Sequence, residues 1–159
     1  MELEFDVKMT PAAMYDYLLH HTYSGMSGIV GTVMGVLLLM FFASTKYPIY
    51  LIAGLVVILY LPLTLWLRAN QQVQGNAAFK KPLHYKMTEE GICVSQDETE
   101  EKQSWESCVR AVSTRNSIIL YTSKTTASIF PKKDLGDKKE ALIAIISTHM
   151  SPEKVKIKC

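Results

Sequence analysis

The sequence predicts an integral membrane protein that combines a hairpin of two transmembrane helices with one soluble α+β domain. Three observations support this prediction. Between Asp16 and Arg68 the only charged side chain is Lys46. The rest of the chain after Arg68 carries fourteen Lys and Arg and eleven Asp and Glu, as in an ordinary soluble domain. From Leu83 onward, short apolar runs alternate with turn residues. A chain of 159 residues has room for one modest domain and a membrane element.

Two charge-free runs have the length of membrane spans. They cover residues 23–44 and 48–67, and at about 1.5 Å per residue each helix would reach roughly 30 Å, the thickness of the hydrocarbon core. Only residues 45–47 separate them, which predicts a hairpin turn. Pro48 suits a first helical turn, and Pro62 should kink the second helix without breaking it.

The distribution of Lys and Arg predicts the orientation of the hairpin. Lys46 alone lies in the turn, and Lys8 precedes the first span. Arg68, Lys80 and Lys81 follow the second span. By the positive-inside rule, both termini are expected in the cytoplasm.

The leader and the cysteines agree with this compartment. Residues 1–22 are acidic and the first apolar run is long, so a signal peptide is not expected. Cys93, Cys108 and Cys159 are odd in number and lack CxxC spacing, which favours a reducing compartment over a disulfide framework.

The residues that flank the hairpin predict local elements. Residues 2–8 alternate charged and apolar, which is typical of a half-exposed strand. Thr10 and Pro11 resemble an N-cap followed by a first-turn proline, so we expect a helix over 12–21 that runs into the first span. Residues 69–82 are polar and fit either a helical extension or a linker; we assign a linker.

Short strands and one helix are expected in the C-terminal part. Strands are predicted over 83–87, 92–94, 118–121 and 127–130, with a charged loop over 96–103. Trp105 opens the next element, and the apolar residues after it follow at helical spacings: Cys108, Val109 and Val112.

A terminal helix should follow Pro131. Asp137 and Glu140 resemble a capping box, and one apolar face follows it: Ala141, Leu142, Ile145, Ile146 and His149. Antiparallel strands closed by one C-terminal helix are the element order of a pleckstrin-homology-like half-barrel, although periodicity alone predicts only α+β. The expected division is a strand and helix over 1–22, the hairpin over 23–68, the linker over 69–82 and the domain over 83–159.

Several short motifs in the soluble part resemble the YcxB-like family of small bacterial membrane proteins. They are Tyr85-x-x-Thr88-Glu89-Glu90-Gly91-Ile92, Ser104-Trp105, Ile119-Leu120-Tyr121 and Ile129-x-Pro131-Lys132. Their order, and the two spans before them, carry most of the resemblance, which extends over nearly the whole chain. The resemblance implies a multi-pass protein of the bacterial inner membrane with a pleckstrin-homology-like cytoplasmic domain. It implies no reaction and no catalytic residues.

The residues themselves do not predict catalysis or a cofactor. His20 and His21 are adjacent and diverge by about 100° on a helix, while His84 and His149 are isolated, so no metal site is expected. Cys108 with a distant histidine has no nucleophile signature and is more often a small buried hydrophobe. No phosphate-binding glycine loop or paired carboxylates are present.

Glycines in the spans are candidates for close helix packing. Gly31 and Gly35 form a GxxxG motif in the first span, and Gly54 lies in the second. Small residues at this spacing let two helix backbones approach closely. The partner is either a second copy, which would give a homo-oligomer, or the other helix of the same hairpin. The second is favoured because that helix is always near.

Clustered lysines are candidates for contact with an anionic membrane or an acidic partner: Lys132, Lys133, Lys138 and Lys139, followed by Lys154, Lys156 and Lys158. Each could contribute about 1 kcal/mol near an anionic leaflet. Acidic residues interleave with them, so an ordinary solvated surface is the competing interpretation. A net charge of +2 does not favour nucleic-acid binding.

Two functional classes follow from these observations. The first is a non-enzymatic, membrane-anchored interaction or scaffold protein whose domain binds a protein, a peptide or anionic lipid headgroups. The second is an accessory subunit or small enzyme acting on a membrane substrate, which a cleft gathering His84, Cys108 or His149 with carboxylates would favour.

The orientation can be measured directly. If both termini are cytoplasmic, a C-terminal fluorescent reporter should be bright and a C-terminal alkaline phosphatase fusion inactive, because the phosphatase needs export to fold. A fusion within residues 45–47 serves as the opposite control. An active phosphatase at the C-terminus would contradict the predicted orientation.

Overall fold

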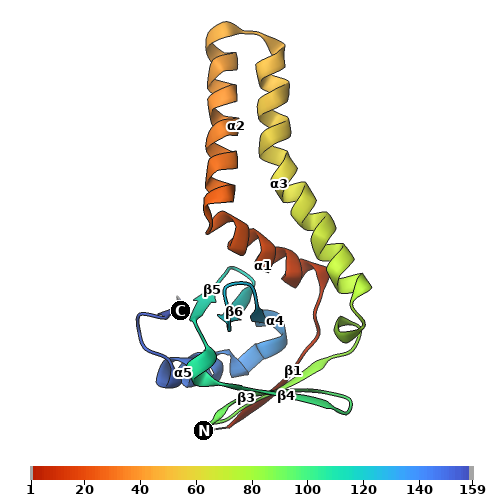
Figure 1. Ribbon diagram of the computed structural model, residues 1–159, viewed down its shortest axis with the longest axis vertical. Helices are drawn as coiled ribbons and strands as arrows, with labels where there is room; N and C mark the ends of the chain where they lie inside the picture. Colours follow the sequence, from red (N-terminus) through yellow and green to blue (C-terminus); the bar gives the residue numbers. More distant parts are fainter. Residues whose placement is uncertain (1, 158–159) are drawn as a thin grey trace.

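The two apolar runs form two long antiparallel helices in the computed structural model, which describes residues 2–157 (Figure 1). Helix α2 is Met26–Thr45 and helix α3 is Pro48–Gly75. Both are long and apolar enough to cross a membrane, and only 11% of the most apolar window of each is buried. Their hydrophobic side chains therefore face outward, unlike those of a core helix in a soluble protein. Lys158 and Cys159 lie outside the described residues.

The rest of the chain forms an α+β domain below the hairpin, as predicted. One antiparallel sheet has the order β1-β2-β3-β4, and its strands are β1 Leu3–Val7, β2 Leu83–Met87, β3 Gly91–Gln96 and β4 Thr99–Ser104. The second has the order β7-β6-β5-β8, with β5 Arg110–Ser113, β6 Ser117–Tyr121, β7 Ala127–Pro131 and β8 Val155–Lys156. Strand β8 runs parallel to β5, and the other pairs are antiparallel.

Helices connect and cover the sheets. They are α1 Pro11–Tyr23, α4 Lys132–Leu135 and α5 Lys139–His149, with short 3-10 turns at η1 Ala77–Phe79, η2 Trp105–Ser107 and η3 Gly136–Lys138. Helix α1 begins as predicted, because the Thr10 side chain accepts a hydrogen bond from the backbone N–H of Ala13 at 3.3 Å.

The hairpin is an insertion between two neighbouring strands. Strand β1 pairs with β2 in a register that sets Leu3 opposite Met87 and Val7 opposite Leu83. The chain therefore leaves the domain after β1, passes through α1 and the hairpin, and returns beside the point where it left. The expected domain boundary at residue 83 leaves out one strand of the sheet, so a fragment over 83–159 lacks part of the core.

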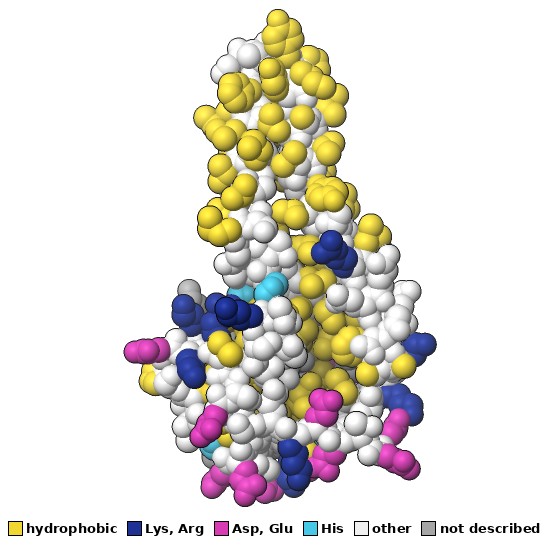
Figure 2. Space-filling model, viewed as in Figure 1, with side chains coloured by type: hydrophobic (Ala, Val, Ile, Leu, Met, Phe, Trp, Pro, Cys, Tyr) yellow, Lys and Arg dark blue, Asp and Glu magenta, His cyan; other side chains and the backbone are white. Residues whose placement is uncertain are grey.

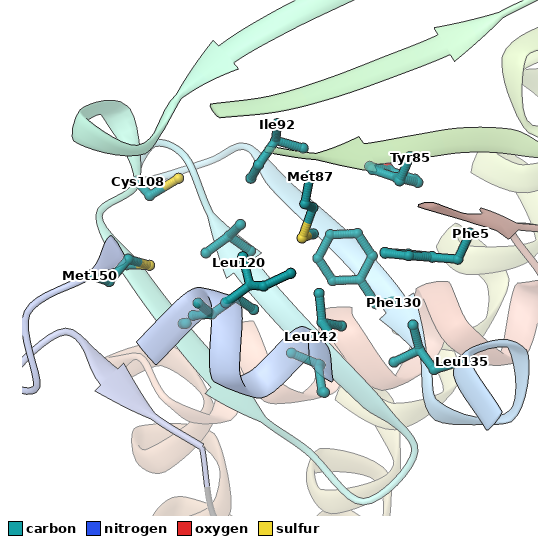
Figure 3. Packing of buried hydrophobic residues seen from close by; sticks show 14 of the residues in the cluster. Phe5, Tyr85, Met87, Ile92, Cys108, Leu120, Phe130, Leu135, Leu142 and Met150 are labelled. Atoms are coloured by element: carbon teal, nitrogen blue, oxygen red, sulfur yellow. The ribbon is translucent and has the colours of Figure 1, made fainter. Parts of the chain in front are cut away.

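The core lies between the two sheets and α5 (Figure 3). Phe5 of β1 stacks on Tyr85 with ring centroids 5.7 Å apart, and Phe130 meets both rings edge-on at 5.5 and 5.0 Å. Helix α5 contributes Leu142 and Ile146, both fully buried. Strand β1 is thus part of the core and not an appendage.

Two details of the N-terminal half differ from the sequence expectations. The first helix does not run into the first span, because the chain turns at Ser24 and Gly25 between α1 and α2. A Cβ on Gly28 would lie 2.7 Å from the carbonyl oxygen of Thr22, so this corner requires glycine. The expected linker over 69–82 is largely helical, because α3 continues past the membrane run and buries its last turns against α1.

Three details of the C-terminal half differ as well. The expected charged loop over 96–103 contains strand β4, whose backbone pairs with β3 while its charged side chains stay in water. The spacing of apolar residues after Trp105 suggests a helix, but the chain forms only a single 3-10 turn there before β5 begins. Val109, one of these apolar residues, is 50% exposed. The capping box is not formed: α5 follows η3 directly, and its N-cap is Lys138 without a side-chain hydrogen bond.

Trp105 is expected to be a major stabilising residue. Its side chain is 7% exposed, and its indole N–H donates to the carbonyl oxygen of Thr88 at 2.9 Å. Trp105→Ala in the full-length protein should cost about 3–5 kcal/mol and lower the melting temperature in detergent micelles. The half-exposed Val109→Ala should change stability by less than about 0.5 kcal/mol. Equal melting temperatures for the two variants would contradict the assignment.

Candidate functional site

Helix α1 is the layer between the hairpin and the domain (Figure 1). It packs against α3 on one side and against β6 and β7 on the other. The apolar contact joins Met14 of α1 to Ala69 and Val73 of α3 and to Ile129 of β7. Because α1 touches both, the domain is fixed to the base of the hairpin and does not hang on a loose tether.

The last turns of α1 carry an aromatic and basic cluster. His21 and Tyr17 each lie with ring centroids 6.1 Å from that of Tyr121 in β6. On the same ring of Tyr121, the Arg110 guanidinium carbon lies 5.0 Å from the centroid, in the range of a cation–π contact. This cluster brings a strand arginine next to the helix that leads into the first span.

His20, at the end of α1, is affected by the charge of the same arginine. Its partial burial, and secondarily the positive charge of Arg110, lower the pKa of His20 below its ordinary value, and Asp16 opposes this weakly. The Ser24 hydroxyl lies 3.5 Å from His20 Nδ1. The neutral form of His20 is therefore favoured. We call the contact of the last turns of α1 with Arg110 and Tyr121 the junction.

A second set of polar contacts fixes the middle of α1. The Thr114 hydroxyl donates to the Asp16 carboxylate, and the Lys132 ammonium donates to the backbone carbonyl oxygen of Thr114. Burial, with help from Lys139, lowers the pKa of Lys132, whereas Asp16 raises it. These contacts tie the β5–β6 turn and α4 to α1.

Lys156 of strand β8 and Lys154, which precedes this strand and donates to the carbonyl oxygen of Cys108 at 3.5 Å, add basic residues beside Arg110. The Ala111 N–H donates to the carbonyl oxygen of Lys154 at 2.9 Å, and Lys156 pairs with Val112. Figure 2 shows Lys and Arg side chains gathered beside histidines directly below the hairpin. We call Arg110, Lys154 and Lys156 the basic rim. The lysine cluster near the end of the sequence predicts the two lysines of this rim but not Arg110, because one arginine on a strand carries no sequence signal.

The structure does not bring the four candidate lysines to one face. Lys132 is engaged with the β5–β6 turn, and it lines a hollow of about 270 Å³ together with Lys133. Lys138 donates to the carbonyl oxygen of Glu4 at 2.8 Å. Strand β1 begins at the end of the molecule remote from the hairpin (Figure 1). Lys138 is thus poorly placed to reach a membrane.

The candidate glycines lie between the two helices of the hairpin. A Cβ on Gly35 would overlap Ile58 of α3, and a Cβ on Gly54 would lie 2.8 Å from Leu39 Cδ2. A Cβ on Gly31 would lie 3.0 Å from Leu61 Cδ1. In this arrangement the glycines serve close packing of α2 on α3 within one chain.

The two isolated histidines considered for chemistry lie in separate places. His84 Nδ1 lies 2.7 Å from an Asp6 carboxylate oxygen on the outside of the first sheet, and the His149 ring packs on Trp105 at 4.9 Å. Burial raises the pKa of the Cys108 thiol, which disfavours the nucleophilic thiolate. Within residues 2–157, no group of three or more His, Cys, Asp or Glu could hold a metal ion.

Comparison with known proteins finds a family match in the C-terminal part. Residues 88–146 match the family described as YcxB-like protein, which confirms the predicted resemblance over that region. The matched region runs from the turn before β3 into α5 and contains Arg110. No curated protein and no solved structure is significantly similar to the chain.

The junction should weaken in acid. The pKa of His20 is lower in the folded protein than in the unfolded chain, so the unfolded chain takes up the proton first as pH falls through about 6.5. Stability from neutral His20 is thus present above that pH and lost below it. His20→Gln should reduce the drop in melting temperature between about pH 7.5 and pH 5.5.

The comparison variant is His84→Gln, which removes a histidine outside the junction. An identical drop in the unchanged protein and in His20→Gln would show that His20 does not couple the junction to pH.

Proposed function

Starting from a YcxB-like region held beneath a two-helix membrane hairpin, we propose that the protein is a non-enzymatic, membrane-anchored binding module. It lies in the bacterial inner membrane with both termini in the cytoplasm. Its domain binds anionic lipid headgroups through the basic rim of Arg110, Lys154 and Lys156. The observation that carries this proposal is the attachment of the rim to the last turn of α1, through the stacking of Arg110 and His21 on Tyr121.

The distance along the chain supports headgroup contact. Residues 24 and 25 are all that separates α1 from α2, the first membrane helix. The headgroup region adds only about 5–7 Å on each side of the hydrocarbon core. A basic side chain next to the last turn of α1 therefore falls within reach of the headgroups, where each contributes about 1 kcal/mol of attraction to an anionic leaflet.

The outer edge of the first sheet is less suited to binding a peptide. Strand β4 is an exposed edge, but its sequence is TEEKQS and its side chains are charged or polar. Charged edges are a common protection against strand addition. The lipid form of the interaction hypothesis is therefore favoured over peptide binding at this edge.

Lipid selectivity tests the proposal. The full-length protein is mixed with both lipids in micelles, and the lipids that stay bound are measured by native mass spectrometry. The protein should retain phosphatidylglycerol in preference to phosphatidylcholine. Arg110→Gln combined with Lys156→Gln should lower this preference by about thirtyfold, because two attractive charges of about 1 kcal/mol each are lost. Rising salt should weaken it as well, since exposed charges are screened over about 8 Å at physiological ionic strength.

The charge-matched control is Lys138→Gln combined with Lys139→Gln, which removes two lysines remote from the rim. The control should keep the preference. Equal retention of both lipids by the unchanged protein, or an equal loss in the control, would contradict the proposal.

A further inference from the structure

An apolar groove opens beside α1, on the membrane-proximal part of the domain. Its volume is about 670 Å³, within the usual range of small-molecule sites. It lies between α1, the end of α3, η1 and β7, and its apolar lining includes Met14, Leu18, Phe79 and Ile129. None of the residues that line it is Asp, Glu, Lys or Arg. The groove is therefore suited to an uncharged, apolar occupant.

The membrane end of the groove lies close to the hydrocarbon boundary. The apolar run of α3 ends at Leu67, and Gln71 and Gln72 of the same helix line the groove. Four residues of helix correspond to about 6 Å, so the groove starts within the headgroup layer. Figure 2 shows hydrophobic side chains along a furrow that leads from the base of the hairpin down into the domain. The apolar surface of the hairpin and the groove are thus continuous.

The opening of the groove is polar but uncharged, which suits the part of an amphiphile between its apolar chain and its headgroup. Gln71, Asn76 and Thr126 contribute amide and hydroxyl groups, and His21 stands at the end of α1. Arg68, one turn before Gln71 and Gln72, supplies a positive charge at the level where the membrane run ends. A lipid with its chain in the groove would keep its headgroup near this charge.

We propose that this groove binds one acyl chain of a membrane lipid. The bilayer is the source, because the groove is continuous with the hairpin surface and begins at headgroup depth. The inference rests on the membrane placement in the proposed function, but it does not depend on which headgroup is preferred. The module would then hold a lipid by its chain as well as attract its headgroup.

Photo-cross-linking of full-length protein in nanodiscs tests the inference. The probes are phosphatidylcholine and phosphatidylglycerol, each with a diazirine in one acyl chain. Both should label peptides around Leu18, Phe79 and Ile129 in addition to the two membrane helices. Labelling confined to α2 and to the membrane part of α3, or cross-linked protein dimers in place of lipid adducts at the groove, would overturn the proposal.

Substitutions inside and outside the groove serve as variants and controls for the labelling experiment. Phe79→Asp should reduce labelling of the groove by about tenfold, because a carboxylate there must be desolvated beside the chain. Phe79→Leu should keep it, and Val109→Asp, which places the same charge at a half-exposed apolar site outside the groove, should keep it too. Ala127→Trp, which fills the groove with a bulky side chain, should reduce labelling without adding charge.

The results separate this inference from the headgroup proposal. Groove labelling by both probes supports the inference even where the protein shows no headgroup preference. A headgroup preference without groove labelling refutes the inference and leaves the proposed function standing. Unchanged labelling in both Phe79→Asp and Ala127→Trp refutes it as well, since either change should displace a bound chain.

Discussion

The pairing of β1 with β2 is the interaction on which the arrangement of the whole molecule depends. It joins residues separated by the entire hairpin, with Val7 opposite Leu83. The two ends of the inserted segment are therefore held side by side, and α1 and the end of α3 must both enter the domain at one place. Phe5 and Val7 reinforce the pairing, because both are buried in the core and β1 cannot leave without exposing them.

Helix α1 turns this constraint into a fixed distance between the domain and the membrane. It is sandwiched between α3 and the β6–β7 hairpin, and Gly28 allows the sharp corner that returns the chain to the first span. The close approach of Gly35 and Gly54 holds the hairpin together above it. The basic rim and the apolar groove both follow from this arrangement, since Arg110 of the rim contacts Tyr121 beside α1 and the groove is lined by α1, the end of α3 and β7.

Local patterns predicted much of the fold. The two spans, the Thr10 N-cap, the hairpin of β6 and β7 and the apolar face of α5 follow from periodicity and turn residues that act within a few positions. Strand β4 was missed because its side chains are all polar, and only its backbone pairing with β3 makes it a strand. The false helical spacing after Trp105 arose because a 3-10 turn and a strand can bury residues at the same intervals as a helix.

The candidate site was harder to predict, for a physical reason. Arg110 becomes part of a basic rim only when β5 pairs with β8 and when His21 of α1 stacks on Tyr121 beside it, and these contacts join segments far apart in sequence. The groove likewise takes its lining from four separate segments. Lysines that cluster in sequence need not share one face, because a helix and its flanking turns distribute neighbouring residues around the domain, as Lys132 and Lys138 illustrate.

Disulfide trapping of β1 against β2 in the full-length protein in membranes tests the central claim most directly. In a variant with the native cysteines replaced, Asp6→Cys with His84→Cys places two thiols directly opposite in the observed register. Opposite positions of an antiparallel pair bring the Cβ atoms about 4.5–5.5 Å apart, close enough for a disulfide to form with small backbone adjustment. Mild oxidation should therefore cross-link this pair far faster than Asp6→Cys with Lys86→Cys, which is out of register by two residues. Equal rates for both pairs, or none for either, would show that β1 does not close the hairpin insertion.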